Sequence, residues 1–183
     1  METINILSID PGTNMGVTIY TVSVPDLTIV NVVTTVIDLS NHTTDDPLSK
    51  NLLLRIQIIQ SYIREIMIAY QPHILAMEAA FVNSRFPKSV MYLSQYIAAI
   101  ELTVTEYNPF IKIFNYAPKM VKSVVSKNGK ADKNDITNAL LGIGEISSKI
   151  DVTYVSEHEA DSIAIGYVCV LELRSNPVLL LMI

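Results

Sequence analysis

The stretch that decides the fold is INILSIDPGT, residues 4–13. Residues 4–9 are mostly apolar and β-branched and predict a buried strand, which Asp10-Pro11-Gly12 ends in a turn. An acidic side chain therefore stands where the first strand leaves the sheet. Residues 16–21 and 27–37 are rich in Val, Ile and Thr, with Pro25-Asp26 as a turn between them. Three consecutive strands with short connections favour an antiparallel meander.

Beyond residue 40 the pattern changes to alternating helices and strands. Asp45-Asp46-Pro47 is typical of a helix start, and apolar residues then recur at helical spacing to about residue 70. Pro72 ends this helix, and residues 73–78 form a fourth predicted strand that closes on Glu78. We expect a fifth strand over 111–116 and further helices over 87–107, 117–125, 132–141 and 157–173. This order predicts an α/β fold, with helices packed on the faces of a mixed five-stranded sheet.

Length and composition limit the class of protein. The 183 residues are 50% hydrophobic and 17% charged, which favours one globular domain over 1–183 with a hydrophobic tail from about residue 174. The single cysteine, Cys169, lies in an apolar run and is expected to be a buried, inert thiol. The chain shows no secretion signal and no run of about 18 apolar residues, so we expect a cytoplasmic protein without a membrane partner.

Acidic residues recur where predicted elements end or begin. Asp10 follows the first strand, Glu78 ends the fourth, and Asp161 lies in the expected first turn of the last helix. His158 precedes Asp161 by three residues and so shares its helix face. If strands one and four are neighbours, Asp10 and Glu78 project from one edge of the sheet.

Carboxylates crowded in this way repel one another unless a cation neutralises them. Mg²⁺ prefers oxygen ligands, and a pair of such ions can clamp the attacking and leaving oxygens of phosphodiester hydrolysis. Each residue also has a structural interpretation: Asp10 as a turn former, Glu78 as a solvated acid, Asp161 as an acid favoured by the helix dipole. A histidine such as His158, taken alone, is more often structural than a metal ligand.

Six segments in chain order resemble motifs of the RuvC-type Holliday junction resolvases. The opening Asp10 motif and Glu78-x-x-Phe81 resemble the first two acidic motifs of that family. The full set is IDPGT-x-MGV (9–17), EAAF (78–81), LSQ (93–95), PKMVK (118–122), GKADK (129–133) and HEADSIA (158–164). These segments are spread over nearly the whole chain.

The resemblance implies a ribonuclease H-like fold, a homodimer, and paired nicks across a four-way DNA junction. It also implies dependence on Mg²⁺ or Mn²⁺, with two ions in each active site. Asp10, Glu78 and Asp161 fall on the acidic metal ligands of the family, and His158 takes the place of the third of its four acids. A neutral imidazole there could bind a metal, Mn²⁺ more readily than Mg²⁺, or orient the attacking water.

The lysines reconcile DNA binding with a net charge of −5. Residues 112–133 contain six lysines and one aspartate, a local charge of +5, while the rest of the chain carries −10. Such a run is often only a solvated face, but Lys122 and Lys133 fall on lysines that serve DNA binding and catalysis in the resembled family. A second segment offers aromatic rings that can stack on unpaired bases, with cations beside them. The residues expected to bind DNA are Phe81, Arg85, Lys88, Lys119, Lys122, Lys127, Lys130 and Lys133.

Other interpretations of the sequence remain open. Actin-like and sugar-kinase ATPases also begin with a strand followed by Asp-x-Gly-Thr, but this chain has only six glycines and one close pair, so we expect no nucleotide cofactor. A related nuclease could act on other branched DNA or on precursor RNA. A third alternative is a junction-binding protein without catalysis, in which His158 marks a decayed site. For the nuclease we expect a nucleoid-associated location.

Overall fold

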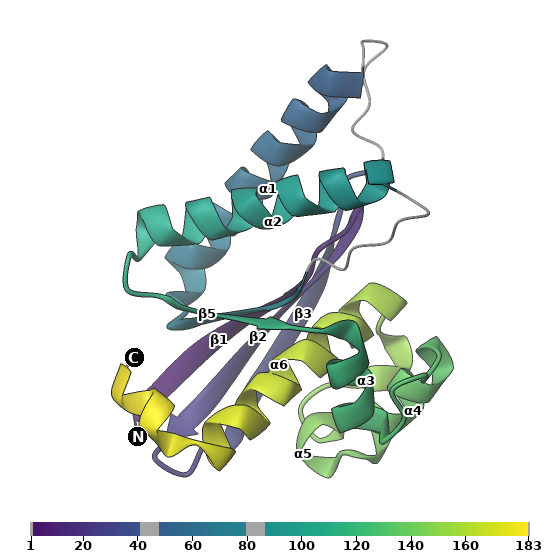
Figure 1. Ribbon diagram of the computed structural model, residues 1–183. Coiled ribbons are helices and arrows are strands. Elements are labelled where there is room, and N and C mark those ends of the chain that lie inside the picture. The colour runs from purple at the N-terminus through teal and green to yellow at the C-terminus, as the bar shows by residue number, and fades with distance from the viewer. Residues whose placement is uncertain (1, 41–47, 80–86, 183) are drawn as a thin grey trace.

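The computed structural model describes residues 2–40, 48–79 and 87–182, in which a twisted sheet lies between two layers of helices (Figure 1). The sheet has five strands in the order β3-β2-β1-β4-β5. β2 is antiparallel to β1 and β3, whereas β4 is parallel to β1 and β5. The predicted mixed sheet and its antiparallel meander are therefore confirmed. The strands are β1 (Glu2–Asp10), β2 (Asn14–Val24), β3 (Ile29–Asp38), β4 (Ile74–Glu78) and β5 (Lys112–Tyr116).

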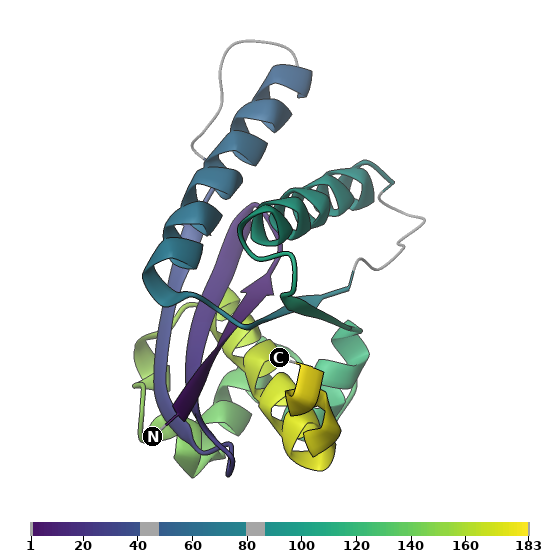
Figure 2. The ribbon, with the colours of Figure 1, turned by 90° about the vertical axis from the view of Figure 1, so that its left-hand side faces the viewer.

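Helices cover both faces of the sheet, as predicted. Figures 1 and 2 show α1 (Leu48–Tyr70) and α2 (Pro87–Tyr107) on one face, and α6 (Glu157–Ser175) lying along the other. Beside α6 lie α3 (Pro118–Ser126), α4 (Lys133–Gly142) and the short α5 (Gly144–Ser147), which the sequence did not predict. The residues of the expected hydrophobic tail, from about 174, form the end of α6 and a 3-10 helix over Pro177–Met182. A second 3-10 helix spans Val152–Tyr154. The predicted helix start at Asp45-Asp46-Pro47 lies outside the described residues.

Two hydrophobic cores form because side chains alternate along the strands. Ile6 and Tyr20 belong to the core under α6, whereas Leu7 and Ile9 belong to the core under α1 and α2. A strand buried on both faces requires apolar residues at nearly every position. This requirement explains the apolar run that opens the chain.

Close packing of α6 on the sheet depends on Gly166. A Cβ atom at this position would collide with the ring of Tyr20 and crowd the Oγ of Ser8. The buried Tyr20 hydroxyl donates a hydrogen bond of 2.7 Å to the carbonyl oxygen of Ile163 on the same helix. A glycine inside a helix lowers helix stability by about 1 kcal/mol relative to alanine. Gly166 offsets this loss by allowing a short distance between α6 and β2.

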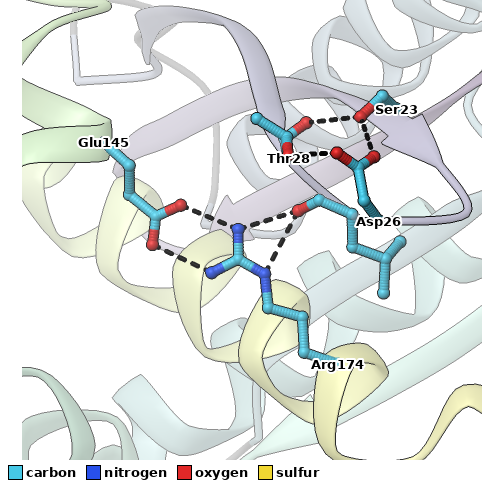
Figure 3. A network of polar contacts seen from close by, with 6 residues as sticks. Ser23, Asp26, Thr28, Glu145 and Arg174 are labelled. Carbon is cyan, nitrogen blue, oxygen red and sulfur yellow. Dashed lines mark hydrogen bonds and ion pairs between the residues drawn. The ribbon is translucent and has the colours of Figure 1, made fainter.

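The C-terminal half of α6 is held by Arg174 (Figure 3). Its guanidinium forms a bidentate ion pair with Glu145 of α5, at 2.9 and 2.7 Å, and donates two hydrogen bonds to the carbonyl oxygen of Leu27. Leu27 is a buried residue with a left-handed backbone (φ 55°) in the turn between β2 and β3. Asp26, in the same turn, accepts hydrogen bonds of 2.6 Å from the hydroxyls of Ser23 and Thr28. The bonds of Arg174 thus fix α6 along the sheet, and those of Asp26 fix the turn that Arg174 contacts.

Cys169 is buried within α6, as the sequence predicts for an inert thiol. Burial raises the pKa of this thiol to about 12, so the nucleophilic thiolate form is absent at neutral pH. In the described part of the chain, no helix combines the length and the apolar character needed to cross a membrane.

Candidate active site

The predicted acidic residues meet at one edge of the sheet. β1 and β4 are parallel neighbours with Ile9 opposite Met77, so Asp10 and Glu78 leave the sheet side by side. α6 runs across the sheet with its N-terminal end at this edge (Figure 1), where His158 Nδ1 lies 3.6 Å from Asp10 Oδ2. Asp161 interacts electrostatically with both Asp10 and Glu78. The structure therefore brings together the four residues that the sequence singled out.

Gly16 makes this meeting possible. In the antiparallel register Asp10 pairs with Gly16 of β2, and a Cβ atom on Gly16 would collide with the carbonyl group of His158. Only a residue without a side chain lets the backbone of α6 come this close to the strand. Sequence reasoning used Gly16 only as part of a motif and missed this role.

The start of α6 is fixed by hydrogen bonds on two sides. Ser156 and Glu159 form a reciprocal capping box, which sets the first turn at residues 157–160. Asp161 is therefore the first residue beyond that turn, which corrects the expectation that it lies within it. Ser162 Oγ lies 2.6 Å from Thr18 Oγ1 of β2, and that hydroxyl lies 3.0 Å from Thr34 Oγ1 of β3. The sequence carries no local signal for this buried chain of hydroxyls, because its members are far apart along the chain.

The carboxyl groups raise one another's proton affinity. Burial, and then the charges of Asp161 and Glu78, raise the pKa of Asp10 from 3.8 to about 8. Burial and the charge of Asp161 likewise raise the pKa of Glu78 from 4.5 to about 7. Burial raises the pKa of Asp161, against the opposing charges of Lys122, Lys133 and His158. These groups cannot all be ionised at neutral pH unless additional positive charge enters the site.

The donor set suits a divalent cation. As the side chains stand, the described residues include no group of three or more His, Cys, Asp or Glu arranged to hold a metal ion. The chemistry of the donors nevertheless fits Mg²⁺ or Mn²⁺, because Asp10, Glu78 and Asp161 carry oxygen donors and their charges repel one another. A cation among them would offset the cost of ionising all three.

Two of the predicted DNA-binding lysines lie beside the acids. Lys133, the first residue of α4, forms an ion pair with Glu157 at the start of α6, and its charge lowers the pKa of Asp10. Lys122 of α3 donates a hydrogen bond of 2.9 Å to the carbonyl oxygen of Ala131 and lowers the pKa of Glu78. These two lysines therefore belong to the electrostatics of the acid cluster.

The remaining lysines of the run separate into two places. Lys119, Lys127 and Lys130 are exposed on α3 and on the connection to α4. In that connection Lys127 has a left-handed backbone, and Asn128 Oδ1 accepts a hydrogen bond of 3.0 Å from the Lys130 amide. Lys112 begins β5 at the opposite end of the sheet from Tyr116, which pairs with Glu78. Lys112 thus contributes to the charge of the run but lies away from the acids.

The second predicted DNA-binding segment is only partly described. Phe81 and Arg85 lie outside the described residues, and Lys88, in the first turn of α2, is described for its backbone only. Their expected contacts with DNA stay predictions.

Comparison with known proteins finds one family over most of the chain. Residues 6–169 match the family described as crossover junction endodeoxyribonuclease RuvC. The RuvC protein of Rickettsia felis is 30% identical over 63% of this chain and 69% of that protein. The RuvC protein of Rickettsia prowazekii is 32% identical over 64% of this chain and 70% of that protein.

Solved structures share the fold. T. thermophilus RuvC in complex with a Holliday junction substrate superposes with a TM-score of 0.70 at 17% identity, covering 94% of this chain and 96% of that one. The yeast mitochondrial Holliday junction resolvase gives a TM-score of 0.63 at 14% identity, covering 94% of this chain and 84% of that one. The ribonuclease H-like architecture expected from the sequence is therefore confirmed.

Proposed function

This chain belongs to the RuvC family of crossover junction endodeoxyribonucleases, and we propose that it resolves four-way DNA junctions by paired phosphodiester hydrolysis. The observation that carries the proposal is the cluster of Asp10, Glu78 and Asp161, whose pKa values are raised by burial at the edge where β1, β4 and α6 meet. The family consists of divalent-metal-dependent nucleases. Membership in it decides against the actin-like or sugar-kinase interpretation.

The three carboxylates are the residues that would hold the metal, for which we propose two Mg²⁺ or Mn²⁺ ions in each site. Bound ions of this kind polarise the scissile phosphate and lower the pKa of the attacking water. Burial of Asp10 and Glu78 supports this role, because a buried carboxylate gains more from a cation than a solvated one does.

His158 is proposed to orient the attacking water and accept its proton. Its Nδ1 lies 3.6 Å from Asp10 Oδ2, which places the imidazole at the acid cluster, where the attacking water would stand. Lys133 is proposed to stabilise negative charge that develops on the phosphate. Its ion pair with Glu157 holds the ammonium group near the start of α6.

The proposed DNA track runs from the acid cluster over α3. Lys122 adjoins the acids, and the exposed Lys119, Lys127 and Lys130 continue the positive charge away from them. We propose that these lysines bind backbone phosphates. The track is narrow, because the protein as a whole carries a net charge of −5.

A homodimer is proposed because two symmetric cuts require two active sites. The outer surfaces of α1 and α2 support this assembly. Large apolar side chains on these helices are more than 45% exposed: Leu53, Tyr62, Ile68, Met91, Leu102 and Tyr107.

The test of this function is a comparison of substrates. The protein is incubated with a synthetic four-way DNA junction, a DNA flap and a structured RNA, each with Mg²⁺ and then with Mn²⁺. We expect cleavage of the junction in preference to the other two. Preferential cutting of the flap or the RNA would favour the related-nuclease alternative, and binding of the junction without cleavage under either metal would favour the non-catalytic one.

A further inference from the structure

A small cavity adjoins the acid cluster on the face of the sheet covered by α1 and α2. It has a volume of about 290 Å³, and the turn Pro11–Thr13, which directly follows Asp10, forms one wall. Arg55 of α1 and the two tyrosines Tyr92 and Tyr96 of α2 form the rest of its polar lining. The tyrosines are four residues apart and so lie on one helix face. The residues that line the cavity include none of Lys119, Lys122, Lys127 and Lys130, which lie on α3 and on its connection to α4.

The guanidinium group of Arg55 lacks a described ion-pair partner. Its Nε is buried and has no hydrogen-bond partner among the described residues, and no described carboxylate forms an ion pair with the guanidinium. The arginines that do have described ion pairs are Arg64, bound to Glu106, and Arg174, bound to Glu145. A guanidinium stays charged at all relevant pH values, and a buried donor without an acceptor is destabilising. Arg55 also lines the cavity without a described carboxylate to balance its charge, so an anionic ligand in the cavity would supply the missing countercharge.

We propose that this cavity binds a backbone phosphate of the DNA strand being cut, close to the scissile phosphate. The proposal rests on the function proposed above. Consecutive Cα atoms are about 3.8 Å apart, so the wall formed by Pro11–Thr13 lies close to Asp10. If the scissile phosphate is held at Asp10, a phosphate in the cavity is therefore one to two nucleotides away along the same strand. The planar fork of Arg55 matches a phosphate in a bidentate geometry, and tyrosine hydroxyls can donate further hydrogen bonds.

With this assignment, positively charged side chains contact the substrate strand from both faces of the sheet. Lys122 and Lys133 act from the α3 and α4 side, and Arg55 acts from the α1 and α2 side. A strand held at both sides of the acids is fixed in position for hydrolysis. Arg55 is thus a positioning residue that contacts substrate away from the reacting atoms.

The test measures junction binding in a protein that carries Asp161→Asn, so that cleavage does not interfere. Binding of a synthetic four-way junction is measured between about 50 and about 200 mM salt, a range over which phosphate contacts dominate the change in affinity. In this background Arg55→Met is expected to weaken binding about tenfold and to reduce the salt slope by about 1. Arg55→Lys retains the charge and is expected to retain the slope.

The control and the thermal readout separate binding from folding. Arg64→Met lies on the same helix, removes an exposed arginine, and is expected to leave affinity and slope unchanged. Arg55→Met should keep or raise the melting temperature, because it removes a buried donor without a partner.

Two results would overturn the inference. One is an unchanged salt slope in Arg55→Met while the parent protein binds the junction. The other is a lower melting temperature in Arg55→Met with the slope intact, which would show a structural role. If the Asp161→Asn parent itself fails to bind the junction, the proposed function fails first, and the inference fails with it.

Discussion

Replacing Asp10 with Asn is expected to stabilise the metal-free protein, and the gain should grow with pH. Burial and neighbouring acids raise the pKa of Asp10 from 3.8 to about 8 in the folded protein. Between these two values the folded state holds a proton that the unfolded state has released. The free energy of unfolding of the wild type therefore falls as pH rises through this interval.

The expected size of the effect follows from the same displacement. A tenfold change in proton affinity corresponds to about 1.4 kcal/mol, so ionisation of Asp10 costs the metal-free protein about 5 kcal/mol at pH 8, where the group is half ionised, and about 6 kcal/mol once ionisation is complete. This cost is comparable with the lower end of typical domain stabilities, about 5–15 kcal/mol. Adding Mg²⁺ to the wild type should offset it, and should do so more at pH 8 than at pH 5, because the ion binds the ionised form.

The assay is urea unfolding, followed by circular dichroism in EDTA at several pH values from 5 to 8, and repeated with Mg²⁺. Asp132→Asn is the matched control, because Asp132 is an exposed helix cap whose role asparagine can fill. That variant should follow the wild-type pH dependence. A wild-type stability that stays level or rises from pH 5 to pH 8, parallel to that of Asp10→Asn, would refute the reasoning.

Three further predictions concern α6 and the lysines. Gly16→Ala should lower the free energy of unfolding by about 1–3 kcal/mol and reduce junction cleavage at least about tenfold, because the new Cβ atom collides with the His158 backbone. The control Gly142→Ala, at a position with open space, should leave both the stability and the cleavage unchanged. Tyr20→Phe should lower the free energy of unfolding by about 1 kcal/mol in urea unfolding, through loss of its hydrogen bond to Ile163. The double variant Lys127→Gln, Lys130→Gln should reduce the salt slope of junction binding by about 2; an unchanged slope would contradict the lysine track.

The sequence predicts the sheet because local and long-range requirements agree there. Residues 4–9 place apolar side chains on both faces of the strand, which suits a strand buried between two helical layers. The connection from β1 through the meander and α1 to β4 returns the chain beside β1, with both strands in the same direction. Asp10 and Glu78 then meet because each stands at the end of its strand.

The sequence does not predict how closely the elements pack. The contact between Gly16 and the His158 backbone joins residues distant in the chain, and a glycine near the start of a strand is equally typical of a turn or a β-bulge. Nor does charge counting show that Lys112 lies away from the acids, since that depends on the direction of β5. The unpartnered Nε of Arg55 is visible only once α1 is packed against its neighbours.

The most direct test of the central claim is to map the nicks on a synthetic four-way junction labelled on each strand. With Mg²⁺ or Mn²⁺ the wild type should cut two opposed strands at symmetric positions, while Asp161→Asn should bind the junction and cut neither. Full activity of Asp161→Asn, or binding without any nick in the wild type under both metals, would contradict the account.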